Sequence, residues 1–182
     1  SESVPTNIVS ATPVEWIECS IGDGASLVGL TDTIDISVNN ESLLGGLFFE
    51  IEDFPDVLVG EGVLTTDRTD GWSLSILDDN GKISIAGFGP LAGADPLQPG
   101  DGPVCRVVVR PQGDQAVTVS LTMTDVQIQD TSNPPVQLNW TAEIGSYEVG
   151  IETQYVMLVD GHGEPGSQMT SPLCLILSLI HI

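Results

Sequence analysis

The sequence predicts an all-β protein, an antiparallel jelly-roll β-sandwich of about nine strands. Three observations support this fold class. Apolar residues occur in short runs, and several of these runs alternate strictly with polar residues. The 20 Gly and 12 Pro residues are spread along the chain between the runs, where turns are expected. No stretch carries a helical apolar period long enough to predict a helix.

The predicted strands can be placed in chain order because each apolar run is bounded by Gly, Pro, Asn or Asp. In the second run, Ile34, Ile36 and Val38 share one face, so that strand is half-buried. An Asn-Gly dipeptide at 80–81 predicts a type I′ hairpin turn, since both positions need positive φ. The run at 105–109 is nearly continuous, which is typical of a central strand. In order, the predicted strands are 16–22, 32–40, 45–54, 56–66, 71–79, 81–89, 103–111, 115–130, 136–144 and 145–151.

The stretch GGLFFEIEDFPDVL, residues 45–58, combines the apolar density of a buried strand with several acids. A period of two sends its residues alternately to two faces. The predicted inward residues are Leu47, Phe49 and Ile51. Phe48 stands among the acids of the other face, so we expect a loop or neighbouring strand to cover it. Pro55 cannot donate to the ladder, so we expect the strand to end there and Val57 or Leu58 to return to the core.

We divide the chain into three parts. Residues 1–15 are polar and Pro-punctuated, and we expect a linker or leader there. Residues 16–150 carry the predicted sandwich. Residues 151–182 form a tail that we expect to be truncated or partly non-native, because residues 177–182 resemble a translated sequencing adapter. The apolar run of the tail is too short to cross a bilayer, so no membrane insertion is predicted.

The charge is strongly acidic: 26 Asp and Glu residues face four Lys and Arg residues, giving a formal net charge of −22. Such a surface repels nucleic acid and anionic membranes, because binding phosphates requires Lys and Arg. The acids are scattered singly, so we expect a solvated surface, with divalent-cation sites as the alternative. Cys19, Cys105 and Cys174 form no metal or redox motif. A Cys19–Cys105 disulfide and two buried free thiols both stay open.

The order of these features resembles the cohesin domain, a jelly-roll sandwich related to one superfamily of carbohydrate-binding modules. The resemblance begins with TIDISVNN at 33–40 and the Gly-led stretch at 45–58. It continues with GWSLSI, NGKISIAGFG, LQPGDGPVCRVVVRP and a closing GSYEVG, and it covers residues 17–149. The resemblance implies a module of a large secreted bacterial protein. Cohesins bind dockerin helices through a variable sheet face, and no motif transfers those contact residues to this chain.

The sequence does not predict an enzyme. Its two histidines, His162 and His181, lie in the tail, which excludes a His-based nucleophilic triad inside the sandwich. A pair of carboxylates could hydrolyse a glycoside, and this is the third hypothesis. Scattered acids produce such pairs by chance, however, so the acids alone do not favour it.

Two kinds of binding site are considered. Sugar binding requires exposed aromatic rings, although a lone Trp in a sandwich is more often a buried anchor. The aromatic candidates are Trp16, Trp72, Trp140, Tyr147 and Tyr155. Of these, the predicted sugar-binding residues are Trp72, Trp140 and Tyr147. Calcium binding requires hard oxygen ligands, although Asp residues in such segments also simply form turns. The candidate calcium ligands are Asp67, Asp70, Asp78 and Asp79.

The leading hypothesis is a non-catalytic, extracellular cohesin-like module that binds a protein partner within a larger secreted or surface protein. The alternative is a carbohydrate-binding module associated with polysaccharide degradation. Neither hypothesis needs a cofactor, apart from the calcium considered above. Exposure of the Trp side chains distinguishes the two, because a coplanar exposed pair favours sugar and burial of all three favours protein binding.

Overall fold

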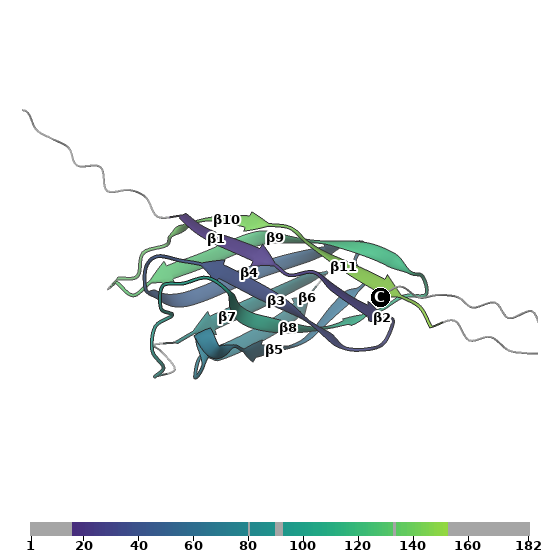
Figure 1. The fold of residues 1–182 in the computed structure, drawn as a ribbon, viewed down its shortest axis with the longest axis horizontal. Coiled ribbons are helices and arrows are strands. Elements are labelled where there is room, and N and C mark those ends of the chain that lie inside the picture. The colour runs from purple at the N-terminus through teal and green to yellow at the C-terminus, as the bar shows by residue number, and fades with distance from the viewer. Residues whose placement is uncertain (1–15, 80, 90–92, 133, 153–182) are drawn as a thin grey trace, which may run out of the picture. The chain divides into compact units, whose positions relative to one another are not determined.

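The computed structural model describes residues 16–79, 81–89, 93–132 and 134–152. The chain divides into two units, Ser1–Ile151 and Glu152–Ile182, and the first contains every described strand. Eleven β-strands and one short 3₁₀ helix, η1, form among the described residues (Figure 1). The elements are β1 (Trp16–Ile21), β2 (Gly24–Leu27), β3 (Asp32–Asn39), β4 (Leu44–Phe54), β5 (Leu58–Thr65), η1 (Asp67–Thr69), β6 (Ser73–Asp79), β7 (Lys82–Phe88), β8 (Pro103–Pro111), β9 (Val117–Asp130), β10 (Asn139–Glu143) and β11 (Gly145–Gly150). In this described part of the chain, no helix has the length and hydropathy to cross a membrane.

The strands form two sheets, which confirms the all-β sandwich. The five-stranded sheet has the order β10-β1-β3-β8-β5, and the six-stranded sheet has the order β2-β11-β9-β4-β7-β6. The structure differs from the prediction in two respects. The strands number eleven instead of about nine, because each of the ten predicted ranges forms a strand of its own and the short segment GASL forms the unpredicted strand β2. Both sheets are mixed, because β1 pairs with β10 and β11 pairs with β2 in parallel.

The core lies between the two sheets, where alternate residues of each strand meet. On β3, Ile34, Ile36 and Val38 are all buried, as their alternation predicts. The six-stranded sheet contributes Phe49 from β4 and Tyr147 from β11, which are among the largest fully buried side chains. The apolar residues of both sheets form one continuous cluster, so a single core holds the sandwich together.

Strand β4 confirms the interpretation of residues 45–58. The buried inward residues are Leu47, Phe49 and Ile51. The strand ends at Phe54, immediately before Pro55, and Leu58 returns to the core with 2% exposure. Phe48 points to the other face and is half-buried, while its cover by a loop or neighbouring strand stays a prediction.

The bend after β4 is organised by one buried carboxylate. Asp53 is only 5% exposed, and its Oδ2 atom accepts hydrogen bonds from the backbone N–H groups of Val57 (2.7 Å) and Leu58 (2.8 Å). Its Oδ1 atom is buried and has no hydrogen-bond partner among the described residues. Desolvation raises the pKa of Asp53 despite these two bonds. The Asp53 carboxylate thus accepts hydrogen bonds from backbone N–H groups at the point where β4 ends and its pairing with neighbouring strands stops.

The β6–β7 hairpin is confirmed as well. The two strands pair antiparallel with Asp79 opposite Lys82, so two residues connect them. Gly81 has a φ of +74°, the positive value that a type I′ turn needs. The other predicted turn residue, Asn80, lies outside the described residues.

The two described cysteines are buried free thiols. Cys19 lies on β1 and Cys105 on β8, and β3 runs between these two strands. Residues two strands apart are separated by about 9–10 Å, which is too far for a disulfide. Burial raises the pKa of both thiols to about 12, so they stay protonated and unreactive at neutral pH. Cys174 lies outside the described residues.

Replacing Asp53 by Ala tests whether its carboxylate stabilises the bend after β4. Asp53→Ala removes the acceptor of two backbone N–H groups, one of them buried, and we expect the free energy of unfolding to fall by about 1–3 kcal/mol. Urea denaturation monitored by tryptophan fluorescence measures the change. Asp56→Ala is the matched control, since Asp56 is an exposed acid of the same bend. An equal loss in both variants would contradict the assigned role.

The pH dependence of Asp53→Asn provides a second test. Because the folded-state pKa of Asp53 is raised, its contribution to stability is present at low pH and is lost as the pH rises through that pKa. Asn keeps an acceptor oxygen but does not titrate. We therefore expect the wild type to gain stability relative to Asp53→Asn as the pH is lowered from about 7 toward about 4. Urea midpoints at several pH values measure the difference, and a pH-independent difference would refute the prediction.

Candidate functional site

The outward side chains of β9, β4, β7 and β6 form one surface, which we call the β4 face. Cross-strand pairing places these side chains in rows. At one end the rows are Ser73, Phe88, Gly46 and Gln129, followed by Ser75, Ala86, Phe48 and Gln127. Further along β4 they are Leu77, Ser84, Glu50 and Asp125, followed by Asp79, Lys82, Glu52 and Thr122.

An apolar hollow of about 210 Å³ lies at one end of the β4 face. Its lining residues are Gly46, Leu47, Phe48, Ala86, Phe88, Gln127 and Gln129. Phe88 is 42% exposed, and its ring lies over Gly46, where a Cβ atom would stand 3.4 Å from the ring. The missing side chain at Gly46 makes room for the ring on the sheet surface. The hollow therefore offers aromatic surface and amide groups to a partner.

The middle of the β4 face carries a group of ion pairs. Lys82 Nζ lies 2.6 Å from Glu50 Oε1 and 2.9 Å from Glu52 Oε1. Thr124 Oγ1 donates to the same Glu50 oxygen at 2.8 Å. Hydrogen bonds from Lys82 and Thr124 lower the pKa of Glu50, and the bonds to Glu50 and Glu52 raise the pKa of Lys82. The charged side chains of the group are only half-buried, so their ion pairs orient side chains more than they stabilise the fold.

Two further apolar side chains are exposed on the β4 face. Phe54 is 80% exposed and lies at the end of β4 opposite the hollow. Leu77 is 64% exposed on the edge strand β6. Together with the hollow, these side chains add exposed apolar surface to a face whose centre is charged.

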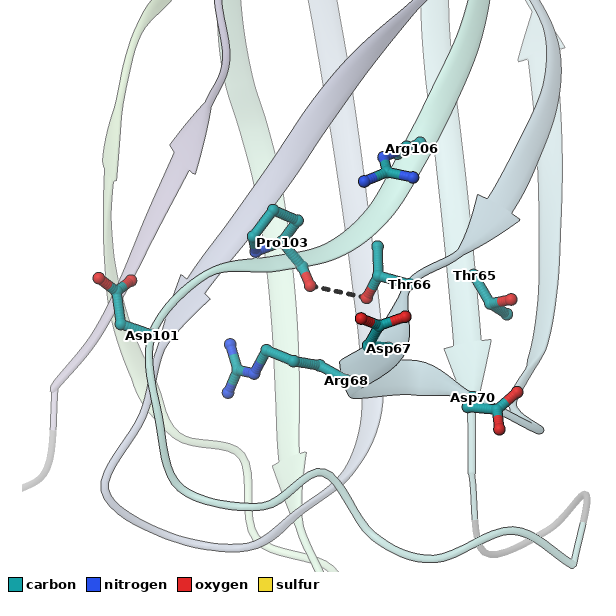
Figure 2. A pocket seen from close by; sticks show the side chains of 8 residues that line it. All are labelled: Thr65, Thr66, Asp67, Arg68, Asp70, Asp101, Pro103 and Arg106. Atoms are coloured by element: carbon teal, nitrogen blue, oxygen red, sulfur yellow. Dashed lines mark hydrogen bonds between the residues drawn. The ribbon is translucent and has the colours of Figure 1, made fainter.

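A second hollow, of about 530 Å³, lies beside η1 (Figure 2). Its lining residues are Thr65, Thr66, Asp67, Arg68, Asp70, Asp101, Pro103 and Arg106. Thr66 Oγ1 donates to the Pro103 carbonyl at 2.7 Å, as drawn in Figure 2. Thr69, which is fully buried, donates to the Val104 carbonyl at 2.7 Å. These two bonds attach η1 to β8.

The Arg68 guanidinium holds the loop that precedes β8. Nη1 donates to the carbonyls of Val38 (2.6 Å) and Gly102 (2.9 Å). Nη2 donates to Asn40 Oδ1 (2.6 Å), and also to the carbonyls of Gln98 and Gly100. Desolvation lowers the pKa of Arg68. Because all five acceptors are neutral protein groups, this arginine is structural and is not a free anion ligand.

The four Asp residues predicted as calcium ligands do not form one site. Asp67 and Asp70 precede β6, whereas Asp78 and Asp79 lie at its opposite end. Asp78 Oδ2 accepts the backbone N–H of Gly60 at 2.6 Å, so this carboxylate joins β6 to β5. Within the described ranges, no group of three or more His, Cys, Asp and Glu side chains is placed to hold a metal.

The aromatic residues predicted to bind sugar are not exposed platforms. Trp72 is 6% exposed, and its indole N–H donates to the Asp95 carbonyl at 2.9 Å. Tyr147 is fully buried, and its hydroxyl donates to Asp32 Oδ2 at 3.1 Å. Trp140 is half-buried and packs against the core. Trp72 and Tyr147 are thus corrected to core anchors, whose polar atoms find partners at the core boundary.

Trp16 is a sequence candidate that is left out of the predicted sugar-binding residues, and the exposed Leu77 and Phe88 are not among the sequence candidates. Strand alternation carries the signal for them. Trp16 precedes the inward Ile17, and Phe88 lies three residues after the inward Ile85, so both point outward. To predict from the sequence which aromatic residues are exposed, the inward-facing residues of each strand must therefore be assigned first.

Comparison with known proteins establishes the fold. No protein-family model and no curated protein matches the chain. The seventh type I cohesin of ScaB from Pseudobacteroides cellulosolvens aligns with a TM-score of 0.62 and 16% identity, covering 78% of this chain and 97% of that one. A type I cohesin–dockerin complex from Clostridium thermocellum aligns at 0.61 and 13% identity, covering 79% and 99%.

A third solved structure comes from an archaeon. The non-cellulosomal cohesin of Archaeoglobus fulgidus aligns with a TM-score of 0.60 and 15% identity, covering 75% of this chain and 92% of that one. At these identities the likeness establishes the fold alone. The chain therefore has a cohesin-like fold with a divergent sequence.

Replacing Arg68 by Lys tests the structural role of the guanidinium. An ammonium group cannot reach the acceptors that the planar fork serves, so we expect Arg68→Lys to lower the free energy of unfolding by about 1–3 kcal/mol. Arg106→Lys is the matched control, because Arg106 is exposed and its Nε pairs with Asp35 at 3.1 Å. That control is expected to change stability by less than about 0.5 kcal/mol. Equal effects in chemical denaturation would disprove the assignment.

Proposed function

We propose that this chain is a non-catalytic, extracellular protein-binding module of a larger secreted or surface protein, with the β4 face as its docking surface. The observation that carries the proposal is the apolar hollow beside Phe48 and Phe88. Solved neighbours in complex with dockerin support a protein as the partner. The sequence resemblance to cohesins supports the extracellular placement within a larger protein.

The length of the β4 face indicates the shape of the partner. Phe48 and Phe54 are six residues apart on β4, which corresponds to about 20 Å. An α-helix of about 13 residues covers the same distance. We infer a helical segment that lies along β4 with an apolar side chain near each end. One neighbour, a cohesin from Acetivibrio cellulolyticus, was solved with a dockerin mutated in its C-terminal helix, a partner of this kind.

The charges of the β4 face indicate the polar part of the partner. Four carboxylates lie on the face: Glu50, Glu52, Asp79 and Asp125. The same rows contain one cation, Lys82, which already pairs with two of them. A partner that buries this surface must therefore bring Lys or Arg residues between its apolar anchors, because unpaired carboxylates are costly to desolvate.

Binding assays with a docking-face variant test the proposal. The wild type is immobilised and exposed to dockerin domains related to those of the solved complexes and to a library of helical peptides. We expect at least one to bind the wild type, and Phe88→Ser to weaken that binding by at least about tenfold, the loss typical of a buried aromatic anchor. Surface plasmon resonance measures the affinities.

Leu64→Ser is the matched control for Phe88→Ser. Leu64 is 50% exposed and lies on β5, in the other sheet. We expect this variant to bind the same partner as tightly as the wild type does. The proposal is wrong if neither the dockerins nor the helical library yields a wild-type binder, or if the control loses as much affinity as Phe88→Ser.

A further inference from the structure

A polar groove lies on the outer face of the five-stranded sheet, away from the β4 face. The groove has a volume of about 280 Å³. Its lining residues are Glu18, Cys19, Ser20, Ser37, Asn39, Asp101, Thr141 and Glu143. The pairing of β10, β1 and β3 places the side chains in two rows. These rows are Thr141, Glu18 and Asn39, followed by Glu143, Ser20 and Ser37.

An exposed tryptophan stands at one end of this groove. Trp16 is 58% exposed and lies on the same face of β1 as Glu18, two residues further along the strand. Its cross-strand neighbour on β10 is Asn139, whose outward face continues into the groove through Thr141. Trp16 contrasts with the buried Trp72, because its ring does not contribute to the core cluster. The ring is thus open for stacking on a ligand.

The chemistry of the groove restricts its ligand. Hydroxyl groups of Ser20, Ser37 and Thr141 both donate and accept hydrogen bonds. Asn39 Nδ2 donates to Glu18 Oε2 at 2.9 Å, which orients that carboxylate. The lining includes three carboxylates and no Lys, Arg or His side chain. Such a groove repels anions and matches a ligand that combines hydroxyl groups with positive charge.

We propose that this groove binds an amino-sugar oligosaccharide, with one pyranose ring stacked on Trp16 and ammonium groups paired with Glu18 and Glu143. A Lys-rich peptide would use the carboxylates but would leave the row of hydroxyl groups without a matching function. A neutral sugar would use the hydroxyl groups but would leave the carboxylates uncompensated. The amino sugar matches the aromatic ring, the hydroxyl groups and the charge together. This site is separate from the β4 face and does not depend on protein docking.

Isothermal titration of the full chain with the hexamer of β-1,4-linked glucosamine tests the proposal. The neutral N-acetylglucosamine hexamer, which has the same backbone, is titrated in parallel at about 0.15 M salt, where long-range attraction is screened. We expect the glucosamine hexamer to bind at least about tenfold more tightly than its acetylated counterpart, and Trp16→Ala to weaken that binding by about tenfold or more. The Glu18→Gln/Glu143→Gln double variant is expected to remove the preference for the charged sugar.

Two controls separate the groove from the general acidity of the surface. The Asp114→Asn/Glu148→Gln double variant removes the same charge from exposed positions elsewhere, and Leu64→Ala truncates another exposed apolar residue of the same sheet. Both are expected to bind like the wild type. The proposal is overturned if the wild type does not bind the glucosamine hexamer, if both sugars bind equally, or if the controls lose as much affinity as the groove variants.

Discussion

Each strand of the sandwich is held in register by the need to keep its alternate side chains between the two sheets, because a shift of one residue would turn its apolar set to solvent. Strand β4 shows how much depends on this constraint. It pairs with β9 on one side and β7 on the other, and its inward residues Phe49 and Ile51 are almost fully buried. The same register turns Phe48 and Glu50 outward. Core burial therefore determines which side chains the β4 face can offer.

Two polar side chains stabilise the ends of the sandwich, where backbone partners run out. Asp53 supplies acceptors to the bend after β4, and Phe54 lies at the start of this bend, so the exposed ring depends on a buried carboxylate. Arg68 binds the carbonyls of Gly100 and Gly102, on either side of Asp101. Asp101 lines both the hollow beside η1 and the polar groove. A structural arginine thereby positions a carboxylate that the ligand of the groove would meet.

The sequence predicts those parts of the fold that depend on local period, and it fails where partners are distant in the chain. The strand positions, the end of β4 before Pro55 and the β6–β7 hairpin all follow from alternation and turn residues. The parallel pairing of β1 with β10 does not, since it joins segments more than a hundred residues apart. Trp72 illustrates the same limit for the site. Its ring fills space left by Gly89, where a Cβ atom would stand 2.3 Å from the indole, and nothing near Trp72 in the sequence shows that space.

The net charge of −22 affects ligand binding because all four basic residues are already engaged within the protein. Lys82 pairs with Glu50 and Glu52, Arg106 with Asp35, and Arg110 with Glu61, while Arg68 is bound to neutral acceptors. Each Lys and Arg of the chain thus has an intramolecular contact. An incoming ligand therefore meets carboxylates whose charge the protein itself does not balance, and any tight contact must be completed by cations from the other side. This shortage of Lys and Arg is the reason that both inferred ligands, a helical partner at the β4 face and a sugar in the polar groove, are basic. The two surfaces otherwise differ, because the β4 face has an apolar hollow beside Phe48 and Phe88 whereas the groove is polar beside Trp16.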